Sequence, residues 1–265
     1  MTTTTWDYII VGAGSAGCVL ANRLSADPAC RVLLLEAGGP ANLPEVRVPA
    51  RYSTLQNSHL DWAYRTTPQA ELYGRRINWP RGRALGGSSA INYMAYVRGL
   101  PLDFDRWAAA GNPGWGYEDV LPYFIRSENN HNLADEYHGQ AGPHHVTTVA
   151  EPNPLAARCL QAAAAIGLPA SPDLNGRQFT GVGLYQANVA GGERCSGADA
   201  FLLPILDRPN LTVQTRALAL QIHFAGRRAV AISYLHEGVV KRADVTSDVL
   251  LTSGSINSPQ LLMLS

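Results

Sequence analysis

Short apolar runs and glycine turns alternate along the first forty residues of the chain. Residues 6–11 (WDYIIV) predict a buried strand, and a glycine turn leads from it into residues 15–25, where apolar positions recur at helical spacing. Residues 31–36 form a second short apolar run that ends in an acid. A strand, a helix and a strand in this order predict one βαβ unit of a parallel sheet.

The next part of the chain loses this regular pattern. Residues 38–99 are rich in Pro, Gly, Arg and Asn and contain few periodic apolar stretches. They predict an ordered but irregular excursion rather than a second sheet, and loops of this length are usually functional. Residues 103–126 then predict two short helices, broken between Gly111 and Gly116.

A second subdomain is expected next, and strands return after it. Residues 142–149 alternate like a strand, residues 154–166 predict an Ala-rich helix, and residues 175–190 return to loop and strand. After them the chain predicts a β-meander of four successive strands, at residues 211–215, 218–224, 229–236 and 241–251.

These elements predict an α/β fold. We expect a Rossmann-like domain, formed by a parallel sheet plus a β-meander, with part of an α+β domain inserted into it. The expected boundaries are residues 1–140 and 191–265 for the discontinuous first domain and 141–190 for the insert.

Composition narrows the class of protein. The 265 residues are 46% hydrophobic and only 16% charged, which is enough to fill one large core or two moderate ones. The 21 basic and 21 acidic residues cancel, so we expect no nucleic-acid partner. Residues 1–8 lack a basic leader region and the apolar run at 8–11 is too short to span a bilayer, which predicts a cytoplasmic protein without a transmembrane segment. The scattered cysteines predict reduced structural thiols: Cys18, Cys30, Cys159 and Cys195.

The strongest local signal is the run Gly12-Ala13-Gly14-Ser15-Ala16-Gly17, which joins the first predicted strand to the first predicted helix. Gly12 permits the tight turn, Gly14 lets the backbone approach a pyrophosphate, and Gly17 lets the helix pack closely on the sheet. Glu36 ends the second strand, where an acid accepts hydrogen bonds from an adenosine ribose and disfavours a 2′-phosphate. NADP is therefore the poorer candidate, while this argument leaves NAD and FAD open.

A second signal lies at residues 78–99 (NWPRGRALGGSSAINYMAYVRG), where Gly86 to Ser89 supply a flexible turn rich in donors. Arg81 and Arg83 add positive charge nearby. On physical grounds alone this segment fits a ligand-binding loop and a structural loop about equally well.

Two segments make a family resemblance specific. RGRALGGSSAIN followed by YMAYVRG at 81–99, and GSINSPQLLMLS at 254–265, resemble the two signatures of the glucose-methanol-choline (GMC) oxidoreductases, closest to their choline-dehydrogenase-like alcohol dehydrogenases. The signatures follow the glycine motif in the expected order, and the resemblance extends over essentially the whole chain, as the N-terminal half of the family. It implies that residues 1–140 and 191–265 form an FAD-binding domain and that 141–190 form part of a substrate-binding domain.

The resemblance also implies a set of FAD contacts. The pyrophosphate and ribose would lie against the glycine motif and Glu36, the flavin against the first signature, and the adenine against a backbone position in the meander. The implied cofactor-binding residues are Gly12, Gly14, Ser15, Ala16, Gly17, Glu36, Ala37, Trp62, Arg81, Ala84, Gly86, Gly87, Asn92, Tyr93, Met94, Ala95 and Leu218. Some relatives tether the flavin through a histidine, and Ala90 stands at that position, so the resemblance implies noncovalent FAD.

The implied reaction removes a hydride from an alcohol carbon, choline-like or aliphatic and primary, and passes it through flavin to an electron acceptor. In the family the base is a histidine paired with a histidine or asparagine, both in a C-terminal half that this sequence, which ends at Ser265, lacks. A complementing C-terminal polypeptide is therefore a possible partner, and a sheet without its later strands would be poorly stable alone. We assign no catalytic and no metal-binding residue, and expect surface or strand-packing roles for His59, His131, His138, His144, His145, His223 and His236.

Rival functions remain open from the sequence. A flavin-binding module without its own catalysis, or one half of a split enzyme, fits the missing base. A lyase or photoenzyme on the same scaffold is a weaker alternative. An NAD-dependent dehydrogenase ranks last, because it would have no use for residues 86–92 and 254–265.

Overall fold

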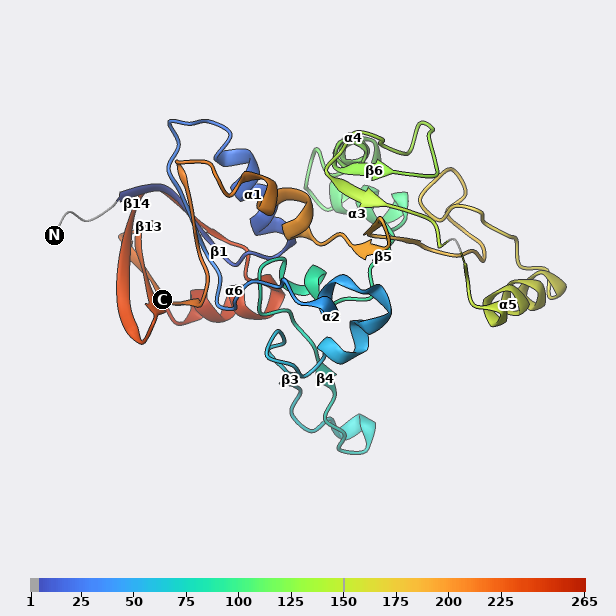
Figure 1. The fold of residues 1–265 in the computed structure, drawn as a ribbon, viewed down its shortest axis with the longest axis horizontal. Coiled ribbons are helices and arrows are strands. Elements are labelled where there is room, and N and C mark those ends of the chain that lie inside the picture. The colour runs from blue at the N-terminus through green and yellow to red at the C-terminus, as the bar shows by residue number, and fades with distance from the viewer. Residues whose placement is uncertain (1–4, 150) are drawn as a thin grey trace. The chain divides into compact units, whose positions relative to one another are not determined.

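The structure is a computed structural model that describes residues 5–149 and 151–265 (Figure 1). Residues 1–4, which carry part of the expectation about a leader, lie outside the described residues. The chain divides into two compact units, unit 1 with Met1–Tyr93 and Arg194–Ser265 and unit 2 with Met94–Glu193. The first division therefore lies at 93/94, earlier than the expected 140/141, while the assignment of the two parts to cofactor and substrate stays a prediction.

The described part of unit 1 is built around a six-stranded sheet with the order β11-β2-β1-β14-β13-β12. Strands β11, β2, β1 and β14 run parallel, and β12, β13 and β14 form an antiparallel meander. This confirms the predicted βαβ unit and the α/β class. The meander forms with three strands rather than the predicted four, because residues 211–214 pair in parallel with β2 instead of joining it. The strands are β1 (Thr5–Val11), β2 (Val32–Leu35), β11 (Leu211–Gln214), β12 (Ala217–Ala225), β13 (Arg228–His236) and β14 (Val239–Leu251).

Helices pack on this sheet because its central strands are apolar on both faces. Ile9 and Leu33 belong to one buried cluster together with Leu261 of α6 (Gly254–Met263). Strand alternation turns the fully buried Ile10 to the opposite face. Helix α1 (Ser15–Leu24) packs against β1 and β2. Helix α6 is an element that hydrophobic periodicity did not predict, because its sequence GSINSPQLLM carries Pro259 and a weak apolar stripe.

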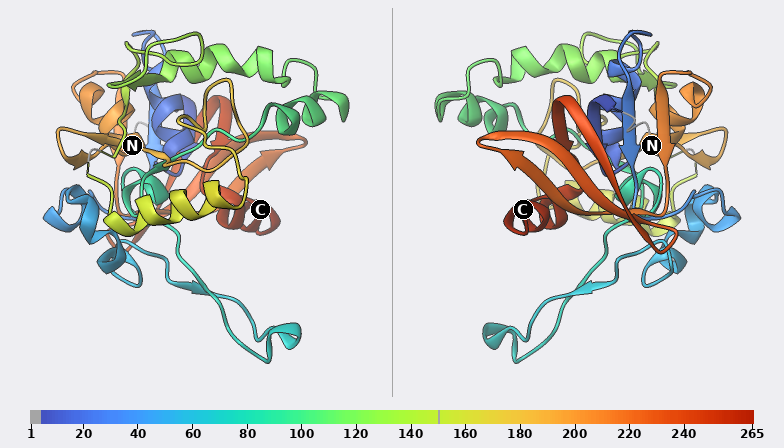
Figure 2. Two further views of the ribbon diagram at one scale, coloured as in Figure 1. Left: turned by 90° about the vertical axis from the view of Figure 1, so that its right-hand side faces the viewer. Right: turned by 90° about the vertical axis from the view of Figure 1, so that its left-hand side faces the viewer.

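The irregular segment of unit 1 is confirmed as a series of short elements. Figure 2 shows that the hairpin of β3 and β4 extends away from the six-stranded sheet. The base of this hairpin is held by the buried Asp61, whose carboxylate accepts hydrogen bonds from the backbone N–H groups of Asn57 (2.8 Å), Ala63 (3.0 Å) and Arg81 (2.8 Å). The elements are α2 (Pro44–Arg47), η1 (Pro49–Leu55), β3 (Tyr64–Arg65), η2 (Ala70–Leu72), β4 (Asn78–Trp79) and η3 (Gly87–Ala90); later in unit 1 come η4 (Ala198–Leu202) and η5 (Leu203–Ile205).

Unit 2 contains the three helices that the pattern predicted, together with several short strands. The Asn153 side chain accepts a hydrogen bond from Leu155 N at the start of α5, which is the expected helix start. The elements are β5 (Ala95–Tyr96), α3 (Pro101–Ala109), α4 (Tyr117–Ser127), β6 (Glu128–Asn130), β7 (His144–Val146), α5 (Pro154–Ala165), β8 (Gln186–Ala187) and β9 (Val189–Ala190), with β10 (Glu193–Arg194) at the boundary between the units.

Two further observations concern the cysteines and the helices. All four cysteines are free thiols, as predicted. Within the described residues, none of the helices has both the length and the apolar character needed to cross a bilayer.

Candidate functional site: a dinucleotide cavity in unit 1

A cavity of about 630 Å³ lies in unit 1 where the parallel strands end. It is lined by Val11 at the end of β1, Leu35 at the end of β2 and Thr252 directly after β14. Strand β1 lies between β2 on one side and β14 on the other, and the order of the strands along the chain therefore reverses at β1. Ligands of open α/β sheets bind at this kind of topological switch point.

The glycine turn after β1 is packed so tightly that side chains are excluded at two of its three glycines. A Cβ atom added at Gly12 (φ +103°) would lie 2.8 Å from Ser253 Cα, and one at Gly17 would lie 1.9 Å from the Gly12 carbonyl oxygen. A Cβ atom at Gly14 would meet only the Thr252 carbonyl oxygen, at 3.8 Å. Gly12 and Gly17 are therefore required by the packing of the turn, whereas Gly14 leaves open space at the cavity wall.

The turns after β1 and β14 are bonded to each other. Thr252 Oγ1 donates to the Gly12 carbonyl at 2.7 Å, and Ser253 Oγ donates to the Val11 carbonyl at 2.8 Å. Each turn begins a ten-residue helix, α1 after Gly14 and α6 after Ser253, and both helix starts line the cavity. The first N–H groups of a helix lack intrahelical partners and carry partial positive charge, so the cavity wall is suited to a phosphate group.

Glu36 joins the glycine turn to the second strand. Its carboxylate accepts hydrogen bonds from Ala13 N at 2.9 Å and from Gly38 N at 2.8 Å, and its side chain is buried. Burial raises the pKa of Glu36, and the two backbone N–H groups oppose this rise. Each carboxylate oxygen retains a further lone pair, so Glu36 holds the turn in place and still lines the cavity as a hydrogen-bond acceptor.

Aromatic side chains from the base of the hairpin form another part of the wall. Trp62 and Tyr64 stack with ring centroids 5.7 Å apart, and the Arg83 guanidinium lies over the Trp62 ring, 4.8 Å from its centroid, in a cation–π contact. The Tyr64 hydroxyl donates to Asn257 Oδ1 of α6 at 2.7 Å. This bond connects the hairpin to the second signature across the wall of the cavity.

The first signature closes against the glycine turn. A Cβ atom at Gly87 (φ +54°) would lie 2.7 Å from Gly14 Cα, and Gly86 N donates to the Ala13 carbonyl at 2.8 Å. The two glycine-rich segments, about seventy residues apart in sequence, thus form one surface without side chains. Such a surface fits the close approach of a dinucleotide pyrophosphate. The N–H donors at the two helix starts fit its phosphates, and the acceptor at Glu36 fits the adenosine ribose.

The structure brings together many of the residues that the sequence singled out. Those that line the cavity are Gly12, Gly14, Ser15, Ala16, Glu36, Ala37, Trp62, Arg81, Gly87 and Leu218. Gly17 and Gly86 support the turn from behind, Ala84 is fully buried, and Asn92 and Tyr93 are exposed elsewhere in unit 1. Met94 and Ala95 belong to unit 2. The role of all these residues as cofactor contacts stays a prediction.

Several lining residues were missed by sequence reasoning. Ala217, Ala219, Leu220, Tyr64 and the stretch from Thr252 to Asn257 line the cavity without having been assigned to it. The signal for the stretch from Thr252 to Asn257 lies in the second signature, which by itself points only to the family. Its position follows from the parallel pairing of β14 with β1, which brings Thr252 next to Gly12.

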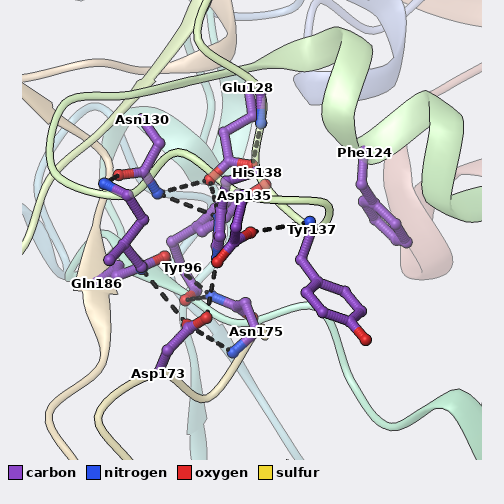
Figure 3. A network of polar contacts seen from close by, with 12 residues as sticks. Tyr96, Phe124, Glu128, Asn130, Asp135, Tyr137, His138, Asp173, Asn175 and Gln186 are labelled. Carbon is purple, nitrogen blue, oxygen red and sulfur yellow. Dashed lines mark hydrogen bonds and ion pairs between the residues drawn. The ribbon is translucent and has the colours of Figure 1, made fainter. Parts of the chain in front are cut away.

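A separate polar cluster lies in unit 2 (Figure 3). His138 is buried at its centre, with Nδ1 3.0 Å from Glu128 Oε1 and Nε2 2.9 Å from Asp173 Oδ2. The Arg98 guanidinium donates to the other oxygen of Glu128, and Asn130 Nδ2 donates to Glu128 Oε1 at 2.8 Å. The expectation of a surface or strand-packing role was wrong for His138, because two carboxylates distant in sequence meet its ring.

The carboxylates of this cluster favour the protonated form of His138. Ligand atoms of Asp135, His138 and Asp173 lie within 4.8 Å of one another, as metal ligands would. Burial alone would lower the pKa of His138, but the hydrogen bonds and charges of Asp173 and Glu128 raise it to about 9. The imidazolium therefore donates one hydrogen bond from each ring nitrogen, to Glu128 and to Asp173.

Comparison with known proteins identifies what the chain is similar to. A family model described as GMC oxidoreductase matches residues 6–265. The chain is 44% identical to an alcohol dehydrogenase (acceptor) of Pseudomonas putida over 98% of its own length and 48% of that protein. It is 48% identical to an oxygen-dependent choline dehydrogenase of Paraburkholderia xenovorans, over 100% of the chain and 48% of that protein. The chain thus spans about half the length of the curated relatives it matches.

Solved structures agree with these sequence matches. Pyridoxine 4-oxidase from Mesorbium loti superposes with a TM-score of 0.94 at 37% identity, over 98% of this chain and 51% of that one. A formate oxidase superposes with a TM-score of 0.90 at 27% identity, over 100% of this chain and 48% of that one. The similarity covers both the sheet and the irregular segments, since nearly the whole chain is aligned.

Proposed function

Because this chain belongs to the GMC oxidoreductase family, we propose that it binds FAD in the unit 1 cavity and serves the oxidation of an alcohol to an aldehyde or ketone. The observation that carries the proposal is the surface of Gly14 and Gly87 beside the buried carboxylate of Glu36, all lining one cavity at the reversal of the strand order. Bound FAD would supply the hydride acceptor for this chemistry.

The chain's own residues would bind and orient the cofactor. The starts of α1 and α6 would donate backbone N–H groups to the pyrophosphate, and Glu36 would accept a hydrogen bond from the ribose. Trp62, which contacts both Tyr64 and Arg83, would exclude water from one side of the cavity. The remaining predicted contacts of unit 1 in the first signature, from Ala84 to Tyr93, would lie toward the flavin.

Substrate and partners follow from the relatives and are proposals for this chain. Choline-like or aliphatic primary alcohols are favoured by the names of the relatives, with an external electron acceptor as the second partner. A complementing C-terminal polypeptide would supply the catalytic base. We further propose a cytoplasmic location and noncovalent FAD, since the buried Ala90 offers no atom for a covalent bond.

An absorption spectrum in the visible range tests the proposal first. The purified chain, loaded with FAD and freed of excess, should show flavin bands, and acid precipitation should release the chromophore to the supernatant. A pellet that stays yellow would contradict noncovalent binding. A colourless protein that takes up no added FAD would contradict the proposed function itself.

Gly14→Ala should separate FAD binding from folding. The added methyl group meets no atom closer than 3.8 Å in the protein but occupies the wall that the pyrophosphate would approach. We expect FAD affinity to fall at least about tenfold, equivalent to about 1.4 kcal/mol. The free energy of unfolding should fall by less than about 1 kcal/mol, the loss that comes from alanine being a poorer N-cap than glycine. Fluorescence titration with FAD and urea denaturation of the apoprotein measure the two quantities. Unchanged FAD affinity would show that the pyrophosphate lies elsewhere.

A second candidate, FAD binding without catalysis, is favoured by the ionisable groups of the cavity. Among the described residues that line it, these groups are Glu36, Tyr64 and Arg81. Glu36 is already bonded to two backbone N–H groups, and Tyr64 to Asn257. An assay with an artificial dye acceptor and choline or a primary alcohol distinguishes the candidates: dye reduction by the FAD-loaded chain supports catalysis, and FAD binding without reduction supports the second candidate.

A further inference from the structure

Arg194 is a buried arginine that ties together three segments of unit 1. Its side chain donates from Nε to the Val46 carbonyl of α2 at 2.9 Å and from Nη1 to the Ser89 carbonyl of η3 at 3.0 Å. Nη1 also donates to Asn92 Oδ1 at 2.8 Å. Arg194 is only 5% exposed. These contacts reach residues more than one hundred positions away in sequence, so they fix the end of the first signature against α2.

The charge of Arg194 is costly to bury. Burial lowers its pKa to about 10, with the Asp199 carboxylate opposing the shift, so the guanidinium remains charged at neutral pH. Within the described residues no carboxylate lies within ion-pair distance of it, and its Nη2 atom is buried without a hydrogen-bond partner. A buried charge and an orphaned donor both destabilise a fold, so stability alone does not account for an arginine at this position.

The contact with Asn92 fixes the orientation of a carboxamide. A guanidinium has donors and no acceptor, so only the oxygen of the Asn92 amide can face it. The amide nitrogen of Asn92 is thereby turned away from Arg194. Asn92 is itself exposed, whereas Arg194 lies beneath it.

We propose that Arg194 is a positioning residue that holds the Asn92 carboxamide with its N–H₂ group outward, as a fixed hydrogen-bond donor for the flavin end of the cofactor. The inference rests on the proposed function, in which Asn92 contacts the flavin. Arg194 acts on the cofactor through the Asn92 side chain, and need not touch the cofactor itself.

A double-mutant cycle tests this role. Arg194→Lys keeps the charge but cannot reproduce three bonds in a planar fork, and Arg194→Met removes the donors altogether. We expect FAD affinity to fall about tenfold or more in Arg194→Met, the weight of one charge-assisted hydrogen bond, and by an intermediate factor in Arg194→Lys. In an Asn92→Ala background, Arg194→Lys should change FAD affinity by less than about twofold, because contacts that act through one residue are not additive.

The matched control is Arg208→Lys. Arg208 also donates to a backbone carbonyl and a hydroxyl in unit 1, Asn22 O at 2.6 Å and Ser25 Oγ at 2.9 Å, but makes no contact with Asn92. The FAD affinity of the Arg208→Lys variant should equal that of the unmodified chain. If Arg194→Lys lowers affinity equally with and without the Asn92 side chain, the positioning role is overturned.

The NMR resonances of the Asn92 side-chain amide give a readout that needs no cofactor. These resonances should shift in Arg194→Lys and stay in place in Arg208→Lys. Because this comparison uses only the two lysine variants, it can be made even if Arg194→Met does not fold. An unmodified chain that binds no FAD would contradict the proposed function, whereas an unmoved Asn92 amide in Arg194→Lys would contradict the positioning of Asn92. The two failures are therefore distinguishable.

Discussion

The Gly17→Ala variant is expected to lose about 3 kcal/mol of unfolding free energy, at the upper end of the usual cost of overpacking. Its methyl group would lie 1.9 Å from the Gly12 carbonyl oxygen and 2.9 Å from Thr252 Oγ1. Both atoms are part of the bonded turns after β1 and β14, so neither moves without disrupting the other. Urea denaturation of the apoprotein measures the loss, and FAD binding should disappear with it.

The control for this variant is Gly226→Ala. Gly226 sits in the turn between β12 and β13 with a left-handed φ of +62°, and a Cβ atom there would meet nothing within 4 Å. The substitution carries only the backbone cost of a left-handed alanine, about 1 kcal/mol. Equal losses of unfolding free energy in the two variants would show that α1 moves away from the glycine turn easily, which would contradict tight packing at Gly17.

The stability of unit 2 is expected to fall as the pH rises from 6.5 toward 9 and beyond. The pKa of His138 is raised from 6.5 to about 9 in the folded protein, so the folded state binds the proton more tightly than the unfolded state. The stabilisation is fully present below pH 6.5 and is lost as the pH rises through the folded pKa. Its size is about 3 kcal/mol, from the free energy equivalent of the shift.

Urea denaturation across this pH range checks the expectation, with His138→Gln for comparison. The variant should be less stable near pH 6 by about 3 kcal/mol or more, because the buried carboxylate of Glu128 keeps its bonds to Arg98 and Asn130 but loses the positive charge of the imidazolium. Its stability should also depend less on pH in this window. A variant with the same alkaline slope as the unmodified chain would assign that slope to another group.

Much of unit 1 was predictable from local sequence. The apolar runs that became β1 and β2 are buried on both faces, which leaves a continuous hydrophobic signal. The glycine turn was predictable because its geometry depends on residues within six positions of each other. Helix α6 was not, because Gly254 and Pro259 weaken its local pattern and the helix is stabilised by packing of Leu261 against the sheet.

The polar contacts were predictable only where they are local. The Asn153 cap reaches two residues along the chain, and its helix start was found. His138 and Asp173 are 35 residues apart, and nothing in either segment indicates the other. For the same reason neither the Tyr64–Asn257 bond nor the contacts of Arg194 could be inferred from the sequence.

Short-range patterns and ordered motifs are enough to predict the α/β class, the glycine turn with Glu36 at the end of the second strand, and the family. They do not predict which residues share the cavity, that α6 supplies a second helix start to it, or that Arg194 and His138 are buried charges. These depend on strand pairing and packing between distant segments, such as β14 beside β1, whose free energy is not encoded in any one stretch of the chain.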